Sequence, residues 1–166
     1  MIDIAGLVHA FGYLGVFLAS LIGSASIIFP VPSFALVIAA GSQFDPFWVG
    51  IISGAGAAIG ELTGYGLGYG IYHLRNKFKK STKKQKEELK GWKKTFKNWF
   101  DNHMGFALIM IFAFTPLPDD VIGIFCGAVK YDIKKFFIAV LIGKIMLGLV
   151  LAYGGLLGFE LFERLF

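Results

Sequence analysis

Two apolar runs of the sequence are each interrupted by a pair of prolines, and this pattern restricts the fold more than any other. The first run reaches Pro30 and Pro32, and the second reaches Pro116 and Pro118. Proline lacks a backbone donor and bars the preceding residue from helical geometry, so both runs should break there. Neither half of either run provides the roughly 20 residues that a helix needs to cross a bilayer. Each run therefore predicts a re-entrant hairpin whose broken backbone lines a cavity.

The composition indicates a membrane protein. The chain has 166 residues, of which 56% are apolar, and a single small core could not bury them. Two uninterrupted segments, 47–72 and 136–159, are long enough to span a bilayer, and each carries one charge near its middle, Glu61 or Lys144. We therefore predict an all-α integral membrane protein with a single membrane domain over residues 1–166. A competing interpretation lets residues 5–29 span fully.

The two halves of the chain align with each other. A separation of 86 residues pairs the prolines, and it also pairs Ser33 with Asp119 and Gly41 with Gly127. A slip of three residues then places Glu61 opposite Lys144. The alignment predicts two repeats, over about 12–72 and 104–160, each consisting of a hairpin followed by a transmembrane helix.

A basic connector, about 73–103, joins the repeats. Residues 75–97 hold 11 of the 16 basic residues, and lysine and arginine favour cytoplasmic loops. We therefore place the connector in the cytoplasm of a multi-pass protein of the plasma membrane, which inverts the repeats relative to each other. Its second half has the aromatic arc of an interfacial amphipathic helix, although a solvated linker is the alternative. Beside apolar spans, such a run indicates contact with anionic lipid and not with nucleic acid.

The candidate functional residues are the ionisable and polar groups at membrane depth. Charges there are costly unless paired or hydrated, so Glu61 and Lys144 are candidates for substrate binding or proton coupling. The alternative is an ion pair between them that only orders the repeat interface. Asp119 and Asp120 are further candidates, or they cap the helix that follows. Three polar residues near Glu61 are candidate contacts: Thr63, Tyr65 and Tyr69.

Other chemistries find little support in the sequence. The single Cys126 excludes an intrachain disulfide, and the three histidines show no metal-ligand spacing. The chain has no motif that pairs a nucleophile with a base. We therefore expect no catalytic residues, no metal and no cofactor, and we do not expect an enzyme.

These features in this order resemble the DedA family, also called the VTT or SNARE-associated Golgi protein domain. The resemblance covers about residues 12–158 and includes the P-x-P-S tip, the basic connector, the second proline hairpin and the element G-[DE]-x-x-x-Y-x-x-G at Gly60, Glu61, Tyr65 and Gly68. It implies a polytopic protein that moves polyprenyl phosphates or glycerophospholipids across or between leaflets, in bacterial members coupled to ion gradients.

The chain departs from the family pattern at several positions. Phe34 stands where members often have an acid, and arginines common in the family fall on Tyr69, Ala113 and Asp119. Lys144 is then the remaining cation deep in the membrane. The leading hypothesis is translocation or scrambling of phosphate-headed lipids, with a proton- or cation-coupled transporter of ions or small solutes as the alternative. Lipids are the expected partners, and a homo-oligomer is compatible with the sequence.

Overall fold

The computed structural model describes residues 12–26, 33–78, 104–115 and 120–165, and these ranges are helical. The helices are α2 (Tyr13–Ala25), α3 (Ser33–Gln43), α4 (Pro46–Phe78), α6 (Met104–Phe114), α7 (Asp120–Val129) and α8 (Ile133–Leu165). No strand occurs in the described ranges, so the all-helical prediction is confirmed for them. Both proline tips and the basic connector from residue 79 to 103 lie outside the described residues.

Both interrupted apolar runs form short helices. Helix α2 ends at Ala25, and Ser26 leaves helical geometry with φ −93° and ψ 85°. Ser26 therefore interrupts the single helix over residues 5–29 that the competing interpretation required, and residues 5–11 and 27–29 lie outside the described residues. Helix α6 ends at Phe114, and the N–H of Thr115 closes a turn onto the preceding carbonyls. The four short helices contain 13, 11, 11 and 10 residues. Each is about 15–20 Å long, well short of a hydrocarbon core of about 30 Å.

The two long helices contain 33 residues each. The segments Pro46–Leu74 and Ile133–Phe159 within them are long and apolar enough to cross a membrane. An aspartate precedes each helix and accepts hydrogen bonds from its first free amides, as an N-cap does. Asp45 Oδ1 accepts the N–H of Phe47 at 2.9 Å, and Asp132 Oδ1 accepts those of Lys134 and Lys135 at 2.9 and 3.0 Å. These bonds, led by that from Lys135, hold the pKa of Asp132 below its usual range, so the cap stays charged at neutral pH.

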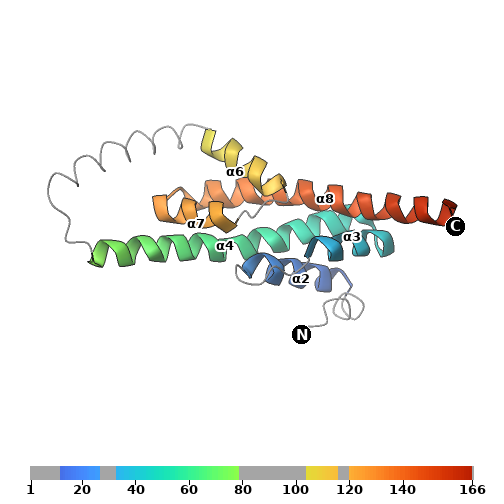
Figure 1. Ribbon diagram of the computed structural model, residues 1–166, viewed down its shortest axis with the longest axis horizontal. Coiled ribbons are helices and arrows are strands. Elements are labelled where there is room, and N and C mark those ends of the chain that lie inside the picture. Colours follow the sequence, from blue (N-terminus) through green and yellow to red (C-terminus); the bar gives the residue numbers. More distant parts are fainter. Residues whose placement is uncertain (1–11, 27–32, 79–103, 116–119, 166) are drawn as a thin grey trace.

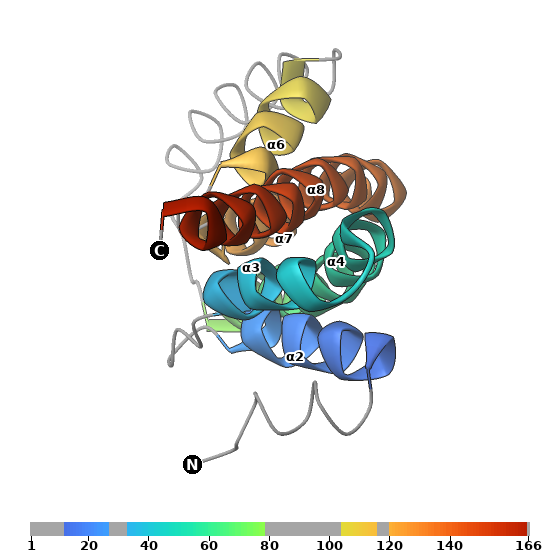
Figure 2. The same cartoon turned by 90° about the vertical axis from the view of Figure 1, so that its right-hand side faces the viewer.

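The long helices lie side by side and run in opposite directions, with α2 and α6 on opposite sides of the pair (Figures 1 and 2). Helix α4 packs against α2, α7 and α8, and α8 packs also against α3 and α6. The first helix of each short pair therefore contacts the long helix that follows it. The second helix of each pair contacts the long helix of the other half.

Glycines bring α4 and α8 into backbone contact along a line that we call the seam. A Cβ atom on Gly50 would lie 2.7 Å from the Cα of Leu149, and one on Gly54 would lie 2.5 Å from the Cα of Ile145. A Cβ atom on Gly148 would lie 2.5 Å from the carbonyl oxygen of Gly50. Small residues allow this approach in membrane helices, where van der Waals packing drives association. The glycines therefore act as a packing surface.

We call the contacts of each second short helix with the long helix of the other half the crossed contacts. Glycines at corresponding positions make them. They join Gly41 with Ala152, Gly155 with Ile38, Gly127 with Tyr65, and Gly68 with Ile124. Helices α4 and α8 begin 87 residues apart, and their contact glycines Gly68 and Gly155 are also 87 apart. The sequence alignment instead used 83 residues to pair Glu61 with Lys144. By the spacing of the contacts, Gly148 and not Lys144 corresponds to Glu61.

Helix α8 has an apolar outer face and a charged inner one. Ile138, Ile142, Met146 and Val150 are exposed, whereas Lys144 is only 6% exposed. A helix of a soluble protein places its charges in the opposite way. The exposed side chains of α8 are therefore those expected of a helix surrounded by lipid.

The crossed contacts can be tested with two glycines of α4. A methyl group on Gly68 would meet the carbonyl oxygen of Ile124, whereas one on Gly66 would meet open space. We expect Gly68→Ala to be destabilising, by about 1–3 kcal/mol as in other overpacked interiors. We expect Gly66→Ala to stabilise by up to about 1 kcal/mol, because alanine is the better helix former. Unfolding in mixed micelles by SDS measures both, and equal effects would contradict the described packing.

Candidate functional site

A buried ion pair joins the two long helices. Lys144 Nζ lies 3.1 Å from Glu61 Oε1, and the two side chains are 6% and 3% exposed. They are the two charged residues that are buried in the described part of the chain. The structure therefore brings together the two spanning-segment charges that the sequence singled out, in the paired arrangement considered as the alternative.

The antiparallel packing explains how two residues at different heights meet. In the register of Gly54 with Ile145, Glu61 lies at the level of Ile138, about 9 Å along the axis from Lys144 at 1.5 Å per residue. Side chains on a helix lean toward its N-terminus. Because α4 and α8 run in opposite directions, the two side chains lean toward each other. The four-carbon stem of the lysine covers the rest of the distance.

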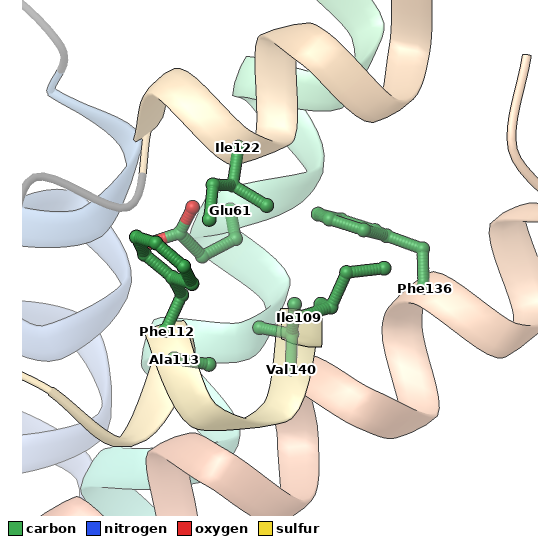
Figure 3. A pocket seen from close by; sticks show the side chains of 7 residues that line it. All are labelled: Glu61, Ile109, Phe112, Ala113, Ile122, Phe136 and Val140. Atoms are coloured by element: carbon green, nitrogen blue, oxygen red, sulfur yellow. The ribbon is translucent and has the colours of Figure 1, made fainter. Parts of the chain in front are cut away.

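A small cavity adjoins the carboxylate. Its walls come from both long helices and from the second short pair, and Glu61 is the ionisable residue among the described side chains that line it (Figure 3). The other lining residues are apolar: Ile109, Phe112 and Ala113 of α6, Ile122 of α7, and Phe136 and Val140 of α8. The cavity volume of about 10 Å³ is close to the space that one water molecule requires. The carboxylate thus has the ammonium group as its ionic partner and a hydrophobic wall toward α6 and α7.

Two residues of the element Gly60, Glu61, Tyr65 and Gly68 on α4 face α7 and the turn that follows it. Tyr65 is buried, and its hydroxyl donates a 2.6 Å hydrogen bond to the carbonyl of Tyr131. Gly68, one turn further, admits the backbone of α7 at Ile124. Gly60 lies on another side of the helix and admits α2 at Leu21. The spacing of this element is therefore explained by the packing of α2 on one side of α4 and of α7 on another, with Glu61 between these two contacts.

The end of α4 contacts the turn between α7 and α8. Lys130 has a left-handed φ of 58°, which is costly for a residue with a side chain. Its ammonium lies 4.2 Å from the ring centre of Tyr72 and 5.6 Å from that of Tyr69. Such cation–π contacts contribute about 0.5–1 kcal/mol at exposed sites. Tyr69, one of the candidate contacts, is thus part of this surface cluster, two turns from Glu61.

Thr63, another candidate contact, lies where α4 meets the end of α2, and the side chain of Asp120 is outside the described set. Thr63 Oγ1 donates to the carbonyl of Gly60 at 2.8 Å and to that of Ala25 at 3.4 Å, so it ties α4 to the end of α2. Ser33 begins α3 and Asp120 begins α7. Five predicted residues lie outside the described ranges: Pro30, Pro32, Pro116, Pro118 and Asp119.

Sequence reasoning missed the partners that complete this site. The Tyr131 carbonyl is a backbone group, and no side-chain pattern identifies a backbone acceptor. The apolar wall of the cavity comes from three helices far apart in the sequence, and its residues resemble any others in their runs. Lys130 had a weak signal, because it is a basic residue that directly follows an apolar run.

The fold and the site together define an α-helical membrane protein of transporter-like construction. Its described part has two helices able to cross a bilayer, exposed apolar side chains along them and a charged pair inside. The family model described as the VTT domain matches residues 31–157. The chain therefore belongs to the VTT-domain family, the DedA family. No curated protein and no solved structure matches the chain.

The energetic character of the ion pair can be tested by removing its members singly and together. Glu61→Gln removes the carboxylate beside the buried ammonium of Lys144. Lys144→Gln removes the ammonium beside the buried carboxylate of Glu61. Each should destabilise the protein by about 3–5 kcal/mol, whereas the double variant should be less harmful than either. Lys135→Gln, at an exposed position, is the control and should be neutral. SDS unfolding in mixed micelles measures all four, and additive effects in the double variant would contradict the pairing.

Proposed function

We propose that this protein is a transporter that translocates or scrambles phosphate-headed lipids across the bilayer. The observation that carries the proposal is the buried Glu61–Lys144 pair, which lies beside an apolar cavity under α6 and α7. Buried pairs give little net stability, and ionisable residues at membrane depth are commonly functional. A lysine there provides a cation for a phosphate, and the glutamate provides a group that can hold a proton.

The packing supports an inverted repeat of two re-entrant hairpins. Each helix of the two short pairs is too short to cross the bilayer. The second helix of each pair packs on the long helix of the other half. The aspartate caps and the contact glycines recur in both halves. Many secondary transporters are built from inverted repeats, with the binding site near the midplane where discontinuous helices meet. In this proposal the prolines mark hairpin tips near the bilayer centre.

The proposed location is the plasma membrane, with the basic connector in the cytoplasm. The large excess of lysine and arginine between the two halves supports this orientation. The second short pair then enters from the cytoplasmic side, together with Lys130, Lys134 and Lys135. Anionic lipids are the proposed partners of the basic connector, and no nucleic acid is required.

The proposed mechanism moves a headgroup without making or breaking its covalent bonds. The phosphate is held by Lys144 and by amides at the hairpin tips, where helix N-termini favour anions. Glu61, with Asp119 and Asp120 as further candidates, exchanges protons as the substrate moves. No cofactor or metal takes part in this scheme, and the described residues contain no cluster of metal ligands.

The test is transbilayer movement of a fluorescent phospholipid in liposomes that contain the purified protein. Dithionite quenching would report movement for the wild type, Glu61→Gln, Lys144→Gln and Asp119→Asn. We expect Glu61→Gln and Lys144→Gln to lower the rate about tenfold or more. A tenfold loss corresponds to a rise of about 1.4 kcal/mol in the barrier. The exposed Lys135→Gln is the matched control and should retain the wild-type rate.

Two outcomes would contradict the proposal. Wild-type rates in both pair variants would show that the ion pair does not serve transport. Wild-type movement no faster than in empty liposomes would favour the alternative, a proton- or cation-coupled transporter of ions or small solutes. Proton uptake driven by candidate solutes, followed with an internal pH dye, would then be the next measurement.

A further inference from the structure

We infer that the turn between α7 and α8 is a binding site for the phosphate group of an anionic phospholipid, with Lys130 as the binding residue. Tyr72 and Tyr69 position its ammonium group. The site lies at the edge of the hydrocarbon core and does not include the buried pair of Glu61 and Lys144. Because binding there requires no movement of lipid between leaflets, the site does not depend on the proposed transport.

Lys130 occupies a position where helices commonly have glycine. The N–H of Tyr131 donates to the carbonyl of Cys126 at 2.9 Å, and that of Lys130 donates to the carbonyl of Gly127 at 3.2 Å. Together these bonds form a Schellman motif, which ends a helix with one left-handed residue, usually glycine. Lys130 is that residue, with φ 58°, and its side chain makes this geometry costly. Strained residues of this kind cluster at ligand sites, so the lysine side chain is a candidate for binding.

The ammonium group of Lys130 is held at a cluster of aromatic rings. It lies 4.2 Å from the ring centre of Tyr72 and 5.6 Å from that of Tyr69. His73 contacts both tyrosines, with its ring centre 4.7 Å from that of Tyr69 and 5.7 Å from that of Tyr72. The ring faces attract the positive charge and fix its place. Because an ammonium group has three N–H donors, it can at the same time donate to a phosphate oxygen.

Both long helices place this turn at the edge of the hydrocarbon core, at the same end of the molecule (Figure 1). The apolar span of α4 is Pro46–Leu74, so Tyr72 lies near its end, and the span of α8 begins at Ile133. Tyr72 follows Glu61 by 11 residues, about 16 Å along the axis and about half of a hydrocarbon core. Tyrosines are enriched at this level. Lipid phosphates lie just outside the core, at the level of Lys130.

The charges of the turn favour an anion. Three exposed lysines lie within residues 130–135, namely Lys130, Lys134 and Lys135, and Asp132 is the one acid of this segment. The carboxylate of Asp132 accepts hydrogen bonds from the first amides of α8. The acid is therefore engaged with the helix, and the turn carries an excess of positive charge. In the proposed orientation the turn faces the cytoplasmic leaflet, whose anionic lipids attract basic segments.

The test is thermal unfolding of the full-length protein in maltoside micelles, with phosphatidylglycerol, phosphatidylcholine or inorganic phosphate added in separate titrations. A ligand that binds the folded state raises the melting temperature, and a tighter ligand does so at lower concentration. We expect phosphatidylglycerol to act at a concentration about tenfold below that of phosphatidylcholine, because the choline cation neutralises the phosphate of the latter. Inorganic phosphate should have no effect, since no acyl chains hold it in the micelle beside the turn.

Two variants of Lys130 separate binding from stability. Lys130→Gln and Lys130→Gly both remove the ammonium, so each should raise the phosphatidylglycerol concentration required by about tenfold, as for a lost hydrogen bond to a charged group. Without added lipid, the glycine variant should melt about 2–4 °C above the glutamine variant, because only glycine relieves the left-handed backbone. A weaker lipid response together with this higher stability would not be produced by misfolding.

Arg164→Gln is the matched control. It removes one exposed positive charge from the last turn of α8, at the opposite end of the helix from Lys130. Nonspecific attraction of anionic lipid by net charge would be reduced equally in Arg164→Gln and Lys130→Gln. A specific site predicts that Arg164→Gln keeps the wild-type response.

Tyr72 is tested as a positioning residue. Tyr72→Phe keeps the ring face and should keep the response to phosphatidylglycerol. Tyr72→Leu should raise the concentration required by about two- to fivefold, which is the contribution of one cation–π contact. Equal responses in the two variants would show that the ring does not position the ammonium.

Four results would overturn the lipid site. They are equal effects of the two phospholipids on the wild type, an unchanged response in both Lys130 variants, an equal loss in Arg164→Gln, and an effect of inorganic phosphate that matches that of phosphatidylglycerol. The last would show that the turn binds free phosphate. A response to phosphatidylglycerol that depends on Lys130 and not on Arg164 is the supporting result. Because the assay measures binding in micelles, this result is independent of whether the protein moves lipids in liposomes.

Discussion

The structure depends on the close backbone contact of two antiparallel helices in a solvent that offers no hydrophobic drive for their association. At the seam of α4 and α8, Gly50, Gly54 and Gly148 leave no room for side chains, so the helices meet at nearly their smallest separation. That proximity fixes the relative heights of the two helices. The height difference in turn allows Glu61 and Lys144, each leaning toward its own N-terminus, to reach each other.

The short helices complete the protein by covering this seam from both sides. Because the second helix of each pair packs on the long helix of the other half, neither half has its contacts complete alone. The hydrogen bond from Tyr65 to the Tyr131 carbonyl and the cation–π contacts of Lys130 hold α7 to α4 at one end. The ion pair lies further along the same helix. The second short pair is therefore held to α4 at the C-terminal end of α7, and Ile122, near the start of α7, borders the cavity.

Much of this could be predicted from the sequence, because proline, charge and length act locally. The two breaks, the two long helices and the singling out of Glu61 and Lys144, which the structure buries as a pair, all follow from rules about single residues in lipid. The register of the repeats could not be predicted, since an alignment of similar letters favoured 83 residues whereas the packing repeats at 87. The turn between α7 and α8 is one residue longer than the turn between α3 and α4. Glu61 and Lys144 were aligned because both are charged, and a shared charged character does not show that two positions correspond. The roles of Tyr65 and Thr63 also needed the fold, because their acceptors are backbone carbonyls.

The register also bears on how many sites the protein offers. The position that corresponds to Glu61 in the other half is Gly148, where even a methyl group would collide with the carbonyl of Gly50 and the hydroxyl of Ser53. The second half therefore has no room for a second acidic group at its matching place, despite the similar arrangement of its helices. Among the described residues, Glu61 and Lys144 are the two buried charged residues, and they form one pair. If copies of the protein associate, each would bring its own Glu61–Lys144 pair, because both partners belong to the same chain.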